Sequence, residues 1–124
     1  MPEEFTLLNE WTKRLGLDDW FIALKTHVKS DDMTLKDSDG CIDYIETIKA
    51  ARIQIVDPAT RKDALRPFNF EETLVHELLH LKFCLIAEGG NWDNKLQLRV
   101  LHQIIDDLSR AFVKMKKAKH NKEL

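Results

Sequence analysis

The sequence predicts an α+β fold in which helices pack against a small, mostly antiparallel sheet of about three strands. Three observations predict it: an N-terminal segment with helical spacing, short alternating apolar stretches in the middle, and two long helical segments at the end. A chain of 124 residues has the length of one domain, which we take as residues 1–124 with a lysine-rich tail over residues 114–124. With 44% hydrophobic and 32% charged residues, the composition excludes collagen, low-complexity disorder and a disulfide scaffold.

The first predicted element is a helix over residues 2–16. Pro2 suits the first turn of a helix, and Gly16 suits its end. The residues that recur at helical spacing between them would lay one face of the helix on a core. They are Phe5, Leu8, Trp11, Thr12 and Leu15.

Three strands follow in the middle of the chain. Residues 19–28 have the apolar, β-branched and aromatic content of a strand, and an aspartate-rich loop over residues 30–40 comes next. Residues 41–46 and 51–56 alternate between polar and apolar side chains, and the short link between them predicts a hairpin. Pro58 ends the last strand, because proline cannot donate to a ladder of backbone hydrogen bonds.

Two long helices complete the predicted fold. Asn69 and Glu72 have the form of a helix N-cap with a reciprocal acidic residue, and the helix over residues 71–88 has apolar residues around most of its surface. Such a helix is buried, so we expect it at the centre of the domain. The last helix is predicted over residues 93–117 from apolar residues at steps of three and four. They are Leu96, Val100, Leu101, Ile104, Ile105, Leu108, Phe112 and Met115.

Charge and composition limit the partners and the compartment. The formal net charge is −2, so no overall charge draws the chain to nucleic acid or to an acidic membrane surface. The N-terminus lacks the basic and apolar regions of a secretory signal, and no apolar run reaches the length of a membrane span. Two cysteines suit a reducing compartment. We therefore expect a cytoplasmic protein that binds neither nucleic acid nor membrane, with a solvated lysine-rich tail.

The predicted central helix carries a motif that binds metal ions. It reads His76-Glu77-Leu78-Leu79-His80, which is H-E-x-x-H. Residues four apart on a helix differ by about 40° around its axis and about 6 Å along it, so both imidazoles can reach one Zn²⁺ ion. Glu77 follows the first ligand, where it can take a proton from a zinc-activated water as a general base. We expect one zinc ion per chain.

A catalytic zinc site needs a third protein ligand. His102 lies on the next helix, which the turn after residue 88 folds back on the first, and it shares that helix with predicted core residues. Asp106 is on the same face, four residues later. His102 as the third ligand, with Asp106 orienting His76 or His80 from behind, is the arrangement we expect. Asp106 as the third ligand is the alternative.

The chain resembles the gluzincin metallopeptidases, in particular their minimal single-domain forms, the minigluzincins, and short phage-type bacterial proteins of that clan. The resemblance rests on His76-Glu77-Leu78-Leu79-His80-Leu81 and on the layout of a small sheet, a motif helix and a ligand-bearing helix. In that group the third ligand is a glutamate on the following helix with an aspartate four residues later. His102 and Asp106 stand in those two places here.

The resemblance implies a function. It implies hydrolysis of peptide bonds in a peptide or protein substrate, with the last strand, residues 51–56, binding the substrate in extended form. It also implies that the C-terminal segment of a latent enzyme can occupy the cleft. The residue that stabilises an oxyanion stays open among Tyr44, His27, Arg52 and Arg66.

Two further hypotheses remain beside a zinc metallopeptidase. The first is a non-catalytic or latent zinc-binding domain that binds a protein or peptide partner. The second is a metal-free helical interaction protein, whose histidines make hydrogen bonds in the core.

Overall fold

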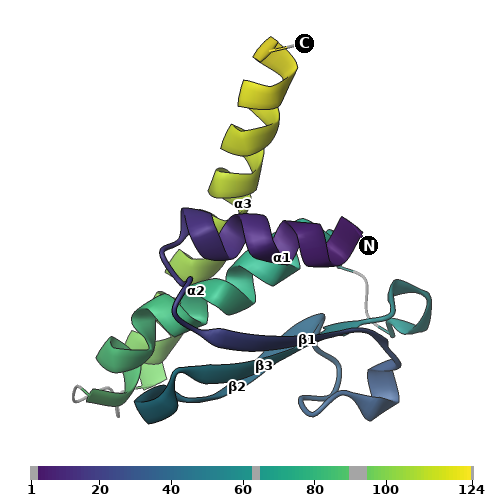
Figure 1. The fold of residues 1–124 in the computed structure, drawn as a ribbon. Helices are drawn as coiled ribbons and strands as arrows, with labels where there is room; N and C mark the ends of the chain where they lie inside the picture. Colours follow the sequence, from purple (N-terminus) through teal and green to yellow (C-terminus); the bar gives the residue numbers. More distant parts are fainter. Residues whose placement is uncertain (1–2, 63–64, 90–94, 124) are drawn as a thin grey trace.

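The computed structural model describes residues 3–62, 65–89 and 95–123, which form three helices and a three-stranded sheet (Figure 1). The α+β class predicted from the sequence is confirmed. The helices are α1 (Glu3–Arg14), α2 (Phe70–Gly89) and α3 (Lys95–Glu123), and the strands are β1 (Phe21–Val28), β2 (Gly40–Ile45) and β3 (Ala50–Val56). Three single-turn 3-10 helices interrupt the connections, at Ser30–Asp32, Glu46–Ile48 and Pro58–Thr60.

The sheet is mixed, whereas we predicted a mostly antiparallel one. Its strand order is β1-β3-β2, and only the predicted hairpin between β2 and β3 is antiparallel. The segment between β1 and β2 spans the end of β3. At that end the backbone N–H of Asp57 donates to Val28, the last residue of β1, and that of Val56 donates to Asp39, the residue before β2. This crossing separates β1 from β2 by the width of one strand. β3 fills the space and pairs in parallel with β1.

The core lies between the sheet and α2, as the apolar composition of that helix predicted. α1 and α2 lie on the same side of the sheet (Figure 1). The side chains of Leu74 and Leu78 on α2 are fully buried, and so are those of Ile53 and Ile55 on β3. The start of α2 is fixed by Asn69, whose Oδ1 accepts a hydrogen bond of 3.0 Å from the backbone N–H of Glu72. The motif helix therefore lies at the centre of the domain.

α3 packs against α2 along its first half and continues beyond the body of the molecule. Ile105, Ser109 and Val113 are buried at four-residue steps, which is the spacing of one helix face. The helix extends to Glu123, past the predicted end at residue 117, and its last turns project away from the other elements (Figure 1). Four of the residues predicted as a lysine-rich tail, Lys114, Lys117, Lys119 and His120, are exposed on this helix.

Candidate metal centre

The structure brings together the three histidines that the sequence proposed as metal ligands. His76 and His80 come from adjacent turns of α2, and His102 comes from the facing side of α3. One ring nitrogen from each lies within 4.8 Å of the others. The ring centroids are 4.7 to 5.5 Å apart. Among the residues that the structure describes, this is the group of potential ligands placed to share one ion.

The distance between two of the three rings equals that of two ligands on a tetrahedral zinc ion. The Nε2 atoms of His76 and His102 are 3.3 Å apart. Two nitrogens bound to one tetrahedral zinc at about 2.0–2.1 Å lie about 3.3–3.4 Å from each other. A hydrogen bond between these two rings accounts for that distance as well, but it does not account for the third ring.

The two histidines of α2 are poised in the neutral form that binds metal. Burial lowers the pKa of His80 to about 4, with further lowering by the neighbouring His76 and His102. Burial is also the largest cause that lowers the pKa of His76, followed by His102. Neutral imidazoles need no proton release before they bind a cation. The donor set therefore fits Zn²⁺ at neutral pH.

Asp106 lies behind His76, on the side away from the other two rings. Its Oδ1 is 3.5 Å from Nδ1 of His76, while Nε2 of His76 faces His102. A hydrogen bond from Arg66 is the largest cause that lowers the pKa of Asp106, so this carboxylate is ionised. The arrangement matches a carboxylate that orients a metal-binding histidine, the role predicted for Asp106. It does not match the alternative in which Asp106 binds the ion itself.

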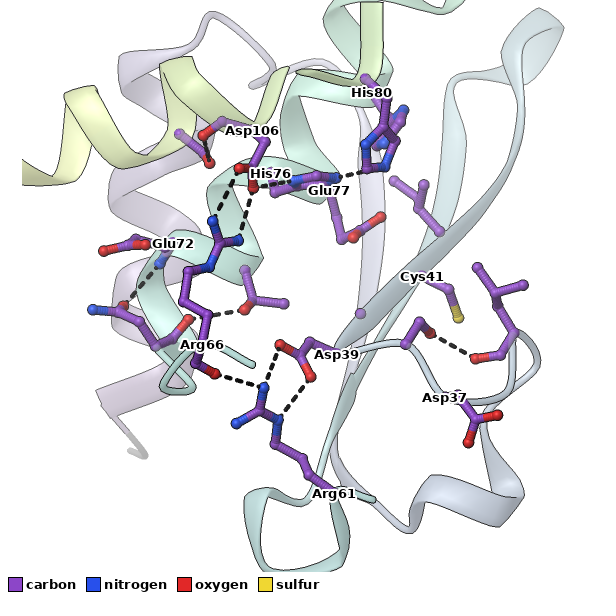
Figure 2. A pocket seen from close by; sticks show the side chains of 18 of the residues that line it. Asp37, Asp39, Cys41, Arg61, Arg66, Glu72, His76, Glu77, His80 and Asp106 are labelled. Atoms are coloured by element: carbon purple, nitrogen blue, oxygen red, sulfur yellow. Dashed lines mark hydrogen bonds and ion pairs between the residues drawn. The ribbon is translucent and has the colours of Figure 1, made fainter. Parts of the chain in front are cut away.

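Glu77 is a buried carboxyl group beside the histidines. Its exposed fraction is 6%, and within the described parts of the chain no hydrogen bond or ion pair reaches its carboxylate. Burial alone raises its pKa to about 8. Gly40 on β2 lies against it, since a Cβ atom added there would be 3.1 Å from Oε2 of Glu77. Figure 2 shows the side chain directed into the space between α2 and β2.

The histidines and Glu77 line one open pocket of about 840 Å³. Its opposite wall is β2, one of the two edge strands of the sheet, together with residues 61, 65–67 and 69. We predicted that residues 51–56 bind substrate in extended form, and this prediction is wrong, because β3 is the central strand with both edges paired. The unpaired edge beside the pocket belongs to β2.

Of the four residues considered for oxyanion stabilisation, two line the pocket and two do not. Tyr44 and Arg66 line the pocket. His27 pairs with Glu4 at 3.1 Å, and Arg52 pairs with Asp43, so both are engaged elsewhere.

The resemblance also implied a latent enzyme, whose C-terminal segment occupies the cleft. In the structure this segment continues α3. His120 consequently lies about 27 Å along the helix axis from His102.

Arg61, which lines the pocket beside Arg66, was not predicted from the sequence as a functional residue. It lies in an irregular segment where no period or motif marks a functional residue. Figure 2 shows its guanidinium between Asp39 and the backbone of Arg66.

Comparisons of the chain with protein-family models, with curated proteins and with solved structures found no match. Within the described residues, no helix is both long enough and apolar enough to cross a membrane.

Proposed function

We propose that this chain is a zinc-dependent metallopeptidase. The observation that carries the proposal is the placement of three histidines around one point, with a buried glutamate in the same pocket that has no partner among the described residues. A structural zinc site is closed by four protein ligands, whereas a catalytic site keeps one position open. Three histidines without a fourth ligand in the described chain favour the catalytic kind.

Each residue has a distinct role in this proposal. His76, His80 and His102 would hold the ion. Zinc bound in such a site lowers the pKa of water to about 7 and polarises a carbonyl group. Glu77 accepts the proton of the attacking water and delivers it to the leaving amine. A nearby cation favours the ionised form of a carboxyl group, so bound zinc would convert Glu77 into the base that the reaction needs.

The free edge of β2 supplies a site for the substrate. An extended peptide can add to an unpaired edge through backbone hydrogen bonds, and β2 borders the pocket along Gly40–Tyr44. A peptide on this edge would lie beside Glu77 and the three histidines. The proposed substrate is therefore an unfolded peptide segment, which can take up the extended conformation.

The test is hydrolysis of an unstructured peptide library, read by mass spectrometry, by the zinc-loaded full chain and by Glu77→Gln. We expect cleavage by the wild type, abolition by a chelator, and a loss of about 10²- to 10⁴-fold in the variant with its zinc retained. Glu3→Gln, at an exposed glutamate of α1 outside the pocket, is the matched control and should cleave normally. Undiminished cleavage by zinc-loaded Glu77→Gln would sink the role of Glu77.

A second candidate is a zinc-binding domain that holds a peptide without cleaving it. One observation favours it: both arginines that line the pocket are already engaged with aspartates, Arg66 with Asp106 and Arg61 with Asp39. Neither therefore points a free guanidinium at a developing oxyanion. Zinc-dependent retention of peptides from the same library, with no cleavage by the wild type, would support this candidate.

A further inference from the structure

Arg66 makes the closest contacts with the carboxylate behind the metal centre. Its two terminal nitrogens donate to the two oxygens of Asp106 at 3.0 and 3.1 Å, across the pocket from the irregular segment to α3. Such a bidentate ion pair fixes the orientation of the carboxylate plane and favours its ionised form. Arg110 also approaches Asp106, but with one nitrogen at 3.3 Å, and its shorter contact of 2.7 Å is with Asp107.

A second arginine holds Arg66 in place. The side chain of Arg61 is only 12% exposed, and its guanidinium donates to Asp39 and to the backbone carbonyl of Arg66 at 3.0 Å. Its guanidinium also lies over the ring of Phe68. Asp39 immediately precedes β2, the edge strand of the pocket. A continuous chain of contacts therefore runs from the start of β2 through Arg61 and Arg66 to Asp106 (Figure 2).

The last link reaches a proposed metal ligand. Oδ1 of Asp106, which accepts a hydrogen bond from Arg66, is also the atom 3.5 Å from Nδ1 of His76. A carboxylate in that position fixes the rotation of the imidazole and its tautomer, so that Nε2 is presented to the ion. The orientation of His76 therefore depends on the orientation of Asp106, and that depends on Arg66.

We propose that Arg66 is a positioning residue of the metal centre, which acts through Asp106 to hold His76 in its metal-binding orientation. This inference rests on the proposed zinc site. It assigns Arg66 a role in metal affinity rather than in oxyanion stabilisation, since its guanidinium already faces Asp106. Through Arg61, the same contacts tie the substrate-binding edge of β2 to the helices that carry the ligands.

The test is the zinc dissociation constant of the full chain, measured by competition with a chromogenic chelator for wild type, Arg66→Gln, Arg66→Lys and Arg110→Gln. Loss of an outer-shell partner typically weakens metal binding about 10- to 100-fold, and we expect about tenfold for Arg66→Gln. Arg66→Lys keeps the positive charge but loses the bidentate geometry, so its zinc dissociation constant should lie between those of the wild type and Arg66→Gln. Arg110→Gln removes a cation from the same carboxylate and should change the constant by no more than about twofold.

A double-mutant cycle with Asp106→Asn distinguishes positioning from a general effect on the fold. If Arg66 acts through Asp106, adding Arg66→Gln to Asp106→Asn should weaken zinc binding no further. The absorption spectrum of the Co²⁺-loaded protein should change in Arg66→Gln and stay unchanged in Arg110→Gln. Thermal unfolding of the metal-free variants reports the folded fraction in each case.

Three results would overturn the inference while leaving the zinc site intact. They are wild-type zinc affinity in Arg66→Gln, equal weakening in Arg110→Gln, and additive losses in the double variant. A wild-type chain that binds no zinc would instead overturn the proposed function and this inference with it.

Discussion

Two glutamates six residues apart on α2 are both largely buried, and their surroundings are opposite. Glu71, with a side chain 12% exposed, accepts a hydrogen bond of 2.7 Å from Nε1 of Trp11 and pairs with Lys116. Lys116 also donates to Glu10 at 2.9 Å, so this cluster joins all three helices. Glu77 has no such partner in the described chain, and its pKa is raised by burial alone.

The difference distinguishes a structural cluster from the site that we propose is functional. Burying an unpaired carboxyl group destabilises a fold, while a paired and hydrogen-bonded one is tolerated. The Glu71 cluster satisfies its charges and needs no ligand. The Glu77 pocket leaves a destabilising group in place, and such groups are found where catalysis or binding requires them.

Neutralising Glu77 in the metal-free protein should have the largest effect on stability, and it tests whether this carboxyl group is destabilising. Below pH about 4.5 this carboxyl group is protonated both folded and unfolded, and it has no effect on stability. As the pH rises towards 8 the unfolded chain ionises and the folded chain does not, so stability falls by roughly 3–5 kcal/mol. Glu77→Gln should therefore raise the free energy of unfolding at pH 8 by about that amount, and leave it nearly unchanged at pH 4.

Urea titrations at the two pH values measure this effect. Glu71→Gln is the matched substitution on the same helix, and it should destabilise the protein at pH 8 by about 1 kcal/mol, because a paired charge is lost. Equal signs for the two variants at pH 8 would contradict the distinction between the two sites.

Removing the metal should destabilise the protein through the histidine site. A ligand present at about 100 to 1,000 times its dissociation constant stabilises the folded state by about 2.7–4.1 kcal/mol. We expect zinc to raise the midpoint of thermal unfolding by roughly 10 °C, and a chelator to reverse the shift. Mg²⁺ prefers oxygen ligands and should produce no shift. An equal shift in His102→Ala would show that zinc binds elsewhere.

A substitution at Lys116 tests whether the Glu71 cluster stabilises the fold. Lys116→Met leaves Glu10 and Glu71 without their shared cation, and we expect a loss of about 1–3 kcal/mol in a urea titration, with zinc affinity unchanged. Burial raises the pKa of Glu10, but the hydrogen bonds from Lys116 and Arg14 outweigh it, so the net shift is downward and the pair stays ionised at neutral pH.

Arg52→Gln is the control for that experiment. It removes a cation from an exposed pair with Asp43 and should change stability by less than about 1 kcal/mol. A loss in Arg52→Gln as large as in Lys116→Met would contradict the structural role given to the three-helix cluster.

Gly40 tests the close approach of β2 to the pocket. A Cβ atom at this position would lie 2.7 Å from Cγ2 of Thr73 as well as against Glu77, so Gly40→Ala should displace the strand or the glutamate. We expect a loss of about 1–2 kcal/mol in stability and a larger proportional loss of hydrolysis than of zinc affinity. Thr73→Ser removes the colliding methyl group and should recover part of the stability. Undisturbed hydrolysis by Gly40→Ala would show that the wall at β2 is not involved.

The parts of this molecule that a local pattern encodes could be predicted from the sequence. The spacing of His76 and His80 on one helix, the position of His102 on the next, and the Asn69 cap all follow from helical geometry. The cluster of three histidines therefore emerged from residues within two predicted helices. The role expected of Asp106 came from the same four-residue step.

The parts that depend on chain crossing could not be predicted. Insertion of β3 between β1 and β2 is decided by how the loop before β2 crosses the sheet, and alternation within a strand carries no signal for that path. The wrong assignment of the substrate edge to residues 51–56 follows from it. The contacts of Arg66 and Arg61 come from an irregular segment, whose position depends on tertiary packing alone.

The proposed function requires that the three histidines bind one zinc ion together. Elemental analysis of the purified full chain, with His102→Ala measured beside it, decides this point. We expect one zinc ion per wild-type chain and much less in the variant. Equal zinc in both would move the third ligand away from His102, and no metal in either after incubation with excess zinc would contradict the site itself.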